Sequence, residues 1–511
     1  MTDKQQKNGI IYLVGSGPGH PGLITKLGYD LLNTSDAVVY DDLIPIELVV
    51  ALPESIKRYY VGKRAGHHSK PQNETNDLLC DLAGKGLTVV RLKGGDPMVF
   101  GRVAEEAAYL KEKGIPHQII PGITSASAAA ADAGFSLTDR RNASWVMLAT
   151  GREAKSASAP VPWEDVGKLD GGTIVVYMGV KDMERIVKSL LEGGMSPDKP
   201  IAVIQNASTG IHQTVRAPLS KIVARCQDAN VVAPALIFIG DVTGQDEFSL
   251  PPKDMPLSGK SVLVTRPAEQ MQGMCDLLRD CGSTPVPYPT ITLTHASDEG
   301  GWIGFEHTID DGGWCVFTSE AGVRHFFHEL LVRGFDHRAL GRFKIAAVGH
   351  GTSSALKERG FVADLIPERA TVKCLSETLV EKGNLRDTSV IRVRGNLADS
   401  SIEDLSAKAG ANVVALNVYR NTNAQWEQNW IDKICSSPPD YLSFTSGSTV
   451  DRFVEILGIE RAKEVASKSR LATIGPPTSA FAEKLGLKVD VEATTFTVPG
   501  LVDALCEDVL R

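Results

Sequence analysis

Short apolar runs alternate with amphipathic stretches through the first half of the chain. The apolar runs predict strands at residues 10–14, 37–40, 88–92, 118–120, 146–149, 174–177, 201–204 and 235–239. Between them, apolar residues recur at helical spacing in 25–33, 102–113 and 183–192. Because strands that alternate with helices are typical of α/β proteins, the pattern predicts an α/β fold with largely parallel sheets.

The strongest break in the chain is the segment 250–259, which holds three prolines within six residues. Proline removes a backbone donor and resists both helix and inner strand, and a new apolar run starts at Ser261. The 511 residues suggest about three domains at roughly 150 residues each. A second loop signal, 155–162, falls between two predicted strands, and we interpret it as a hinge or surface loop between two lobes.

The second half of the chain repeats itself at offsets of 126 to 128 residues. The matched pairs are 261–266 with 389–394, Gly282 with Gly410, 317–319 with 444–446, and 348–349 with 474–475. A nearly constant offset indicates an internal duplication. We therefore expect two α/β lobes of one design that face each other across a cleft, where small-molecule sites usually occur.

Composition narrows the class of protein. The 42% hydrophobic and 23% charged residues exclude bulk disorder and a fibrous protein. No apolar run is long enough to predict a membrane span, and residues 1–8 lack the apolar core of a signal peptide. The eight cysteines form no C-x-x-C pair, which is typical of a reduced, cytoplasmic protein without a zinc ribbon, and we predict no metal site. The net charge of −8 with no long basic run argues against a nucleic-acid partner.

Four motifs rich in glycine or small residues follow predicted strands in the first half. Their sequences are Gly15-Ser-Gly-Pro-Gly, Arg91-Leu-Lys-Gly-Gly-Asp-Pro, Pro121-Gly-Ile-Thr-Ser-Ala and Tyr177-Met-Gly. The first matches neither G-x-G-x-x-G nor a P-loop, and a tight structural turn is its alternative explanation. Glycine lets the backbone approach a ligand closely, and a carboxylate at a strand end can accept hydrogen bonds from a ribose or an amine.

In this order, and with Tyr-Asp at 40–41 and Gly-Lys-Arg at 62–64, the motifs resemble those of uroporphyrinogen-III C-methyltransferase over residues 9–246. The resemblance implies a two-lobed tetrapyrrole methyltransferase fold. It also implies two methylations of uroporphyrinogen III to precorrin-2, with S-adenosyl-L-methionine as the methyl donor. The residues that it places at the cofactor site are Pro18, Gly94, Gly95, Asp96, Val99, Thr124, Ser125, Met178 and Ala207. His20 and Met98 depart from the residues that the family usually has at these positions.

Asp41 and Lys63 match the family's proposed acid–base pair. A carboxylate suits this chemistry because a carbon nucleophile must lose a proton after methyl transfer, although a strand-end cap or turn residue is the alternative for Asp41. Arg102, Glu105 and Arg140 match substrate-contacting positions. The many carboxylates of the substrate need cationic partners. The candidates are Lys63, Arg64, Arg91, Lys93, Arg102, Arg140 and Arg141, of which Arg64 and Arg141 are better explained as surface charges or ion pairs.

The C-terminal half is similar to uroporphyrinogen-III synthase. The residues that carry this resemblance are Thr-Arg-Pro at 265–267, Phe-Thr-Ser at 317–319, Val-Tyr-Arg at 418–420, 444–450 and 474–478. It implies a bilobed, internally duplicated α/β fold that closes hydroxymethylbilane into uroporphyrinogen III, inverting the last ring, without a cofactor. Tyr419 matches the family's tyrosine and would donate to the leaving hydroxyl; a packing tyrosine is an equal alternative. The predicted substrate anchors are Arg266, Thr318, Ser319, Ser446, Ser448 and Thr478, with helix N-caps as the alternative for the serines and threonines.

We therefore expect a methyltransferase domain at 9–246, a linker at 247–259 and a synthase domain at 260–511. One synthase lobe would combine 260–290 with 419–511, and the other would be 291–418. The expected protein cyclises hydroxymethylbilane and methylates the product, on the sirohaem or cobalamin branch. It would be a cytoplasmic homodimer formed through the methyltransferase half. Two alternatives stay open: a methyltransferase whose second half is a bilobed ligand-binding or regulatory module, and a methyltransferase of the same fold acting on a later corrin precursor.

Overall fold

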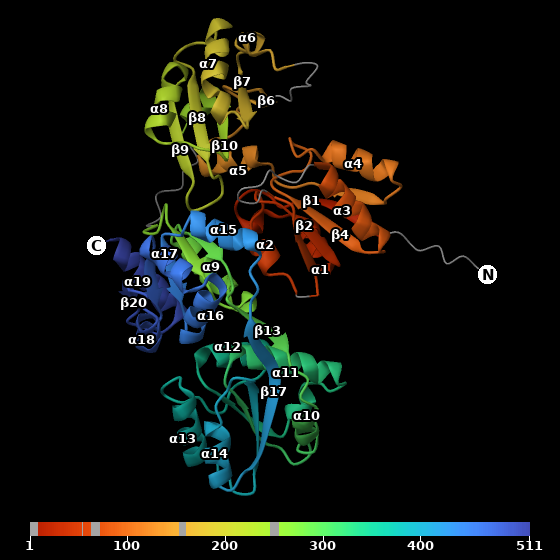
Figure 1. The fold of residues 1–511 in the computed structure, drawn as a ribbon, viewed down its shortest axis with the longest axis vertical. Helices are drawn as coiled ribbons and strands as arrows, with labels where there is room; N and C mark the ends of the chain where they lie inside the picture. The colour runs from red at the N-terminus through yellow and green to blue at the C-terminus, as the bar shows by residue number, and fades with distance from the viewer. Residues whose placement is uncertain (1–8, 54, 63–71, 153–159, 246–254, 511) are drawn as a thin grey trace, which may run out of the picture. The chain divides into compact units, whose positions relative to one another are not determined.

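The computed structural model describes all residues except 1–8, 54, 63–71, 153–159, 246–254 and 511. The described chain divides into two compact units, one of Met1–Pro289 with Trp426–Arg511 and one of Thr290–Gln425. Four five-stranded sheets form the framework, and helices pack against them (Figure 1). The predicted α/β class is confirmed. The predicted hinge at 155–162 falls largely outside the described residues, and the assigned domain boundaries stay predictions.

The first sheet is parallel throughout. Its strand order is β3 (Lys57–Tyr60), β2 (Ala37–Tyr40), β4 (Thr88–Lys93), β1 (Ile10–Gly15) and β5 (His117–Ile120). The connecting helices are α1 (Lys26–Thr34), α2 (Glu47–Val50), α3 (Gln72–Gly84) and α4 (Val103–Glu112). The carboxyl ends of the strands therefore share one edge, which is where ligands bind in open parallel sheets.

The second sheet departs from the predicted parallel arrangement. Its order is β6 (Trp145–Thr150), β7 (Gly172–Tyr177), β10 (Ala235–Ile239), β8 (Pro200–Gln205) and β9 (Gln213–Pro218), and only β6 and β7 pair in parallel. The prediction was wrong here because β10 inserts between β7 and β8, antiparallel to both, and a loop without an α-helix joins β8 to β9. The helices of this region are α5 (Ser125–Asp132), α6 (Trp163–Val166), α7 (Met183–Glu192) and α8 (Ile222–Asp228).

The third sheet combines strands from both ends of the C-terminal half. Its parallel order is β12 (Thr284–Pro287), β11 (Ser261–Val264), β18 (Tyr441–Phe444), β19 (Arg470–Thr473) and β20 (Val491–Glu492). Its helices are α9 (Gln272–Asp280), α15 (Gln428–Ser436), α16 (Gly447–Leu457), α17 (Ile459–Ser467), α18 (Pro476–Lys484) and α19 (Val498–Val509). This sheet belongs to the same compact unit as the first two sheets.

The fourth sheet forms the centre of the second unit. Its order is β13 (Ile291–His295), β17 (Asn412–Asn423), β16 (Ser389–Gly395), β14 (Gly313–Phe317) and β15 (Phe343–Ala347). β13 is antiparallel to β17, and the other pairs are parallel. Its helices are α10 (Glu299–Glu306), α11 (Glu320–Val332), α12 (His350–Glu358), α13 (Val372–Lys382) and α14 (Ser401–Lys408).

The third and fourth sheets confirm the internal duplication. The spatial order β12-β11-β18-β19 in the third sheet corresponds to β17-β16-β14-β15 in the fourth. Each strand of the third sheet and its counterpart in the fourth lie in, or next to, segments that the sequence repeat matches. Gly282 and Gly410 follow α9 and α14 with φ of +86° and +87°. Each glycine lets the chain turn out of its helix in the left-handed conformation that other residues rarely adopt.

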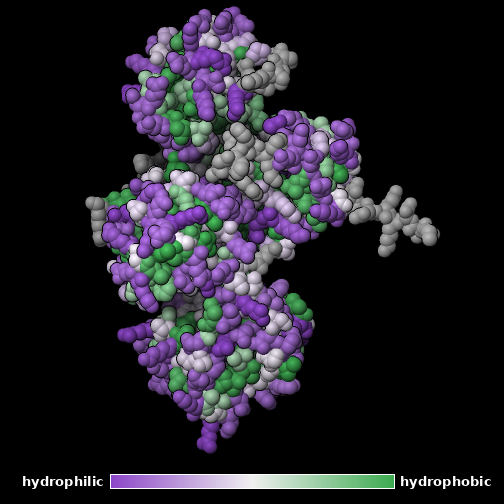
Figure 2. All heavy atoms as spheres, viewed as in Figure 1, coloured by the Kyte–Doolittle hydropathy of each residue, from purple (hydrophilic) through white to green (hydrophobic). Residues whose placement is uncertain are grey.

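On the face shown in Figure 2, hydrophobic residues are scattered among hydrophilic ones. In the part of the chain that the structure describes, no helix has the length and apolar character needed to cross a membrane.

Candidate functional site

Three glycines meet at the carboxyl edge of the first sheet. Gly15 ends β1, Gly95 follows β4 by two residues, and Gly122 precedes α5. A Cβ added to Gly15 would lie 2.6 Å from the Gly95 carbonyl oxygen and 2.7 Å from the Gly122 Cα. Gly17 and Gly95 exchange two backbone hydrogen bonds, 3.2 and 3.0 Å long. Because these backbones pack this closely, peptide groups rather than side chains line this edge.

A loop at the end of the second sheet contacts the glycine-rich loop that follows β1. Pro18 is buried, and the neighbouring Gly19 packs on the backbone of Ala207 and Ser208. A Cβ at Gly19 would overlap the carbonyl oxygen of Ala207. Met178, directly after β7, has a left-handed φ of +55° and an exposed side chain. Pro18 and Ala207, which are far apart in sequence, therefore lie together.

The start of α5 connects the two sheets. The Thr124 hydroxyl lies 2.6 Å from the hydroxyl of Tyr177, which ends β7. The Tyr177 ring packs against Phe100 with centroids 4.9 Å apart. The amide nitrogen of Ser125 would lie 3.7 Å from a Cβ added to Gly95. Thr124 and Ser125 thus face the same glycine edge.

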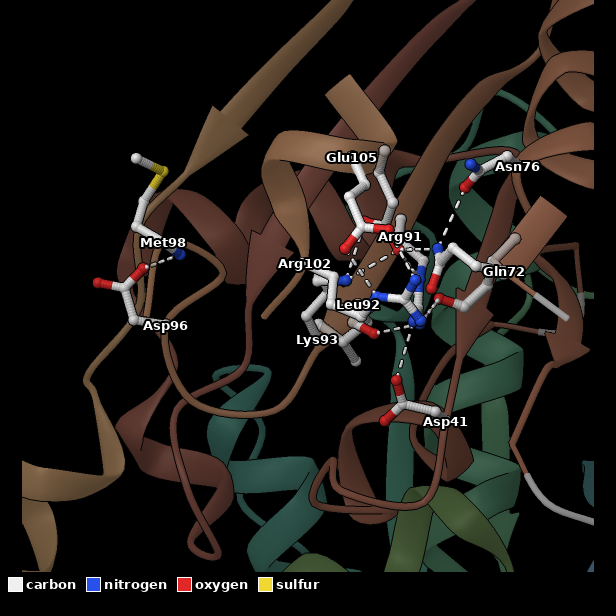
Figure 3. Close-up of polar contacts among 12 residues, drawn as sticks. Asp41, Gln72, Asn76, Arg91, Leu92, Lys93, Asp96, Met98, Arg102 and Glu105 are labelled. Atoms are coloured by element: carbon white, nitrogen blue, oxygen red, sulfur yellow. Dashed lines mark hydrogen bonds and ion pairs between the residues drawn. The ribbon is translucent and has the colours of Figure 1, made fainter. Parts of the chain in front are cut away.

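The turn after β4 is stabilised by its own acidic residue. The Asp96 carboxylate accepts a 2.9 Å hydrogen bond from the Met98 amide (Figure 3). The Val99 amide donates to the Asp96 carbonyl oxygen at 3.1 Å. Gly94 lies against the loop after β2, where an added Cβ would be 2.6 Å from the Leu43 carbonyl oxygen. The turn that holds Asp96 and Val99 is therefore fixed between the loop after β2 and the loop after β1, whose Gly17 is hydrogen-bonded to Gly95.

A buried charge cluster contacts Asp41 through Arg91 (Figure 3). The fully buried Glu106 accepts hydrogen bonds from the Lys93 ammonium at 2.8 and 2.9 Å and from the Gln72 amide at 3.0 Å. Arg91 Nε lies 3.5 Å from Glu106, and Arg91 Nη2 donates to Asp41 at 2.9 Å. Burial, followed by the charge of Arg91, lowers the pKa of Lys93. The cluster fixes the half-buried Asp41 carboxylate through β4 and α4.

This cluster corrects one expectation. Arg91 and Lys93 were predicted to supply positive charge to an anionic substrate, but both are buried and paired with carboxylates of the protein. Their long side chains point into the interior because β4 is buried on both faces. Arg141, by contrast, forms the predicted surface ion pair, 3.0 Å from Asp139.

The predicted substrate contacts of the first half lie near the surface. Arg102 donates to both carboxylate oxygens of Glu105, at 2.9 and 2.6 Å, and this hydrogen bonding lowers the pKa of Glu105. Both side chains are more than half exposed. Arg140 is also exposed. Lys63 and Arg64 lie outside the described residues.

Tyr419 of β17 lies within the second unit. Its hydroxyl is 3.1 Å from the Ser319 hydroxyl, and its ring stacks on His325 with centroids 5.6 Å apart. A Cβ added to Gly395 would lie 2.5 Å from the Tyr419 ring. Burial, followed by the charge of Arg324, lowers the pKa of His325 to about 4. Tyr419 is thus half-buried against a neutral histidine and has a hydroxyl partner.

The predicted serine anchors also cap helices. Ser319 begins α11 and accepts a 2.9 Å hydrogen bond from the Gly322 amide. Ser446 begins α16, accepts from the Thr449 amide at 3.3 Å, and lies 2.9 Å from the Ser448 hydroxyl. The N-cap explanation therefore describes Ser319 and Ser446 in this structure, while the exposed Ser448 stands at the same helix end.

The other predicted anchors are distributed over the two units. Thr318 lies between the end of β14 and the start of α11 in the second unit. In the first unit, Thr478 is buried in the first turn of α18, and Arg266 Nη2 donates to Gln270 at 2.9 Å. No group of three histidine, cysteine or acidic side chains suited to a metal occurs among the described residues.

Sequence reasoning missed Glu106, and the chain did contain a signal for it. Glu106 lies on the buried face of α4 with Val103 and Leu110, at helical spacing. A charged residue on the apolar stripe of a helix indicates a buried partner of opposite sign. The partner itself could not be identified, because Lys93 is brought to Glu106 only by the packing of α4 on the sheet.

Comparison with known proteins identifies the two halves. The model of the tetrapyrrole (corrin/porphyrin) methylases matches residues 10–223, and that of uroporphyrinogen-III synthase HemD matches residues 273–503. The porphyrin biosynthesis protein HemD of Ruminiclostridium josui is 32% identical over 516 residues, covering 98% of each chain. The chain is a fusion of a tetrapyrrole methylase and a uroporphyrinogen-III synthase. Both resemblances found in the sequence are confirmed.

Two further relatives are named as uroporphyrinogen-III methyltransferases, and the alignment with the first extends beyond the methylase half. The uroporphyrinogen-III C-methyltransferase of Bacillus subtilis (strain 168) is 36% identical over 365 residues, 70% of this chain and 74% of that protein. The S-adenosyl-L-methionine-dependent uroporphyrinogen III methyltransferase of Methanosarcina barkeri (strain Fusaro / DSM 804) is 41% identical over 235 residues. That alignment covers 46% of this chain and 92% of that protein.

Proposed function

We propose that the chain catalyses two consecutive reactions of tetrapyrrole biosynthesis. The synthase half closes hydroxymethylbilane into uroporphyrinogen III with inversion of the last ring. The methylase half then methylates this product twice, with S-adenosylmethionine as donor, to give precorrin-2. The proposal is supported by the two family models and by the activities after which the two methyltransferase relatives are named. The structural observation that supports it most directly is the glycine edge at the ends of β1 and β4.

The residues at that edge fit the donor. A Cβ at Gly15 would clash with the backbone of Gly95 and Gly122. A Cβ at Gly95 would lie 3.7 Å from the Ser125 amide nitrogen, in space that a ligand could occupy. The residues that would hold the donor are Pro18, Gly94, Gly95, Asp96, Val99, Thr124, Ser125, Met178 and Ala207. When bound, S-adenosylmethionine supplies an electrophilic methyl group. The Asp96 turn and the Thr124–Tyr177 contact would fix its orientation.

In the methylase half, Asp41 would accept the proton that the substrate carbon loses after methylation. The hydrogen bond from Arg91 holds this carboxylate in place, and Asp41 also lines a cavity. Lys63 is proposed as its acid–base partner, and Arg102, Glu105 and Arg140 as contacts to the substrate. Arg102 can reach a substrate carboxylate when it releases Glu105, because their exposed ion pair is weak.

In the synthase half, Tyr419 would donate a proton to the leaving hydroxyl of hydroxymethylbilane. Departure of water leaves an azafulvene cation, which must be held while the ring closes. The Ser319 hydroxyl positions the Tyr419 hydroxyl at 3.1 Å. Arg266, Thr318, Ser446, Ser448 and Thr478 would anchor the substrate carboxylates. We propose that this half needs no cofactor, because proton donation and conformational control suffice for the reaction.

One anaerobic incubation with hydroxymethylbilane and S-adenosylmethionine, analysed by chromatography and mass spectrometry, tests both activities. Dimethylated type III product is expected. If only the spontaneous type I macrocycle forms, methylated or not, the second half is a binding or regulatory module. Asp41→Asn should still bind S-adenosylmethionine but lose methylation, and full methylation by this variant would exclude the base role.

The remaining assignments extend the same proposal. We place the product on the sirohaem or cobalamin branch, the protein in the cytoplasm, and its quaternary structure as a homodimer through the methylase half. Methylation of uroporphyrinogen III but not of a later corrin precursor would separate this proposal from the alternative methyltransferase.

A further inference from the structure

A cavity of about 320 Å³ in the first unit is lined by both halves of the fusion. The methylase half contributes Asp41 and Asp42, which follow β2, and Tyr60, which ends β3. The synthase half contributes Trp430 and Lys433 from α15. The cavity therefore contains the proposed base of the methylase reaction together with residues that a methylase domain by itself would lack.

Specific contacts fix the synthase lobe that carries α15 against the methylase half. The Tyr40 hydroxyl donates to Glu427, at the N-terminal cap of α15, at 2.9 Å. Arg279 Nη2 pairs with Glu47 at 2.5 Å, with both side chains largely buried. Val50 of α2 packs into the hydrophobic core of the synthase lobe. Apolar packing and a buried ion pair occur together here, so this wall is part of one packed body.

The residues that line the cavity are chemically complementary to a substituted pyrrole. The carboxylates of Asp41 and Asp42 can accept hydrogen bonds from pyrrole N–H groups. The Trp430 ring, stacked on Tyr288 with centroids 5.2 Å apart, offers an apolar wall for a flat ring. Among the described lining residues, Lys433 alone is cationic. The acidic lining residues Asp41, Asp42 and Asp432 would repel a carboxylate arm of the substrate, and Lys433 would attract it.

We propose that Lys433 of the synthase half binds a carboxylate arm of the tetrapyrrole while the methylase half methylates it. The inference rests on the proposed function and extends it, because it makes α15 of the synthase half a wall of the methyl-acceptor site. The substrate pyrrole faces Asp41, and the arm extends to the exposed Lys433 ammonium. The synthase half then contributes to methylation even when its own product is supplied ready-made.

The test is methylation of preformed uroporphyrinogen III at saturating S-adenosylmethionine. Lys433→Met should raise KM roughly tenfold, or ~1.4 kcal/mol, because a charge-assisted hydrogen bond is lost, while kcat stays within about twofold. The KM of Lys433→Met should also depend less on salt than that of the unaltered chain. Lys433→Arg keeps the charge and should restore most of the affinity. Cyclisation of hydroxymethylbilane should be unaffected.

Lys468→Met is the matched control, because Lys468 caps the adjacent helix α17, is exposed, and pairs with Glu464 at 2.7 Å. Its KM should equal that of the unaltered chain. An unchanged KM in Lys433→Met would overturn the inference. If the unaltered chain does not methylate uroporphyrinogen III at all, the proposed function itself fails. Should Lys433→Met melt at a lower temperature, Lys433→Gln replaces it with the same expected KM.

Discussion

Replacing Glu106 with glutamine removes one negative charge from a fully buried cluster while keeping the size of the side chain. Glu106 is inaccessible to solvent, and the side chains of Arg91 and Lys93 are each 7% exposed. The Lys93 ammonium makes two hydrogen bonds to the Glu106 carboxylate, at 2.8 and 2.9 Å. In Glu106→Gln, Lys93 stays buried beside Arg91 without its counter-charge.

The cost follows from that geometry. Removing one partner of a buried ion pair costs about 3–5 kcal/mol. Lys93 can avoid the buried charge by losing its proton, which at pH 7 costs at most about 5 kcal/mol from a reference pKa of about 10.4. A loss of 1 kcal/mol lowers the melting temperature of a domain of roughly 150–250 residues by roughly 2–4 °C. The melting temperature of the transition that includes the methylase half should therefore fall by about 6–20 °C.

Glu105→Gln is the matched control, because Glu105 is the neighbouring residue on α4 and its ion pair with Arg102 is more than half exposed. Such a pair contributes about 0–1 kcal/mol, so its transition should fall by less than about 4 °C. Differential scanning calorimetry measures both variants. Burial lowers the pKa of Lys93, and the loss of the Glu106 charge lowers it further in Glu106→Gln. As the pH rises, Lys93 therefore loses its proton earlier in the folded variant than in the folded unaltered chain, and the cost of burying its charge disappears. The stability deficit of Glu106→Gln should therefore shrink as the pH rises towards about 10, the reference pKa of lysine. Equal melting temperatures of the two variants, or a deficit independent of pH, would contradict this prediction.

Three further predictions concern other parts of the chain. Gly15→Ala should abolish S-adenosylmethionine binding in calorimetric titration, because its Cβ would lie 2.6 Å from the Gly95 carbonyl oxygen; Gly84→Ala, which has open space, should bind normally. Tyr419→Phe should slow cyclisation about a hundredfold, measured as type III product, and an unchanged rate would exclude the acid role. The pKa of His325 is about 4 in the folded chain and 6.5 in the reference state, so the unfolded chain binds more protons between these values. The second unit should lose stability as pH falls from about 6.5 to 4, and His325→Asn should remove that part of the dependence in thermal scans.

The strands of the first sheet and the glycine motifs after them could be predicted because both signals are local. An apolar run followed by glycines can be recognised within a short segment such as residues 10–19. The strands of a parallel sheet all end at the same edge, so the glycines that follow them are expected to lie together. The duplication was equally accessible, since a repeat preserves its spacing. The insertion of β10 between β7 and β8 could not be predicted, because strand and helix periodicity does not specify which strands pair.

The family of each half and the α/β class follow from the sequence, because both depend on residue order and local pattern. Only the folded arrangement of the chain specifies which charges are available to a substrate. The sequence predicts that Arg91 and Lys93 are cations near a ligand. In the structure Arg91 pairs with Asp41 and Lys93 pairs with Glu106, which lie on other parts of the chain. Lys433 gave no signal in the sequence and reaches the cavity of Asp41 through packing between the halves. Charge pairing acts through space, so residues distant along the chain decide it only after the fold has brought them together.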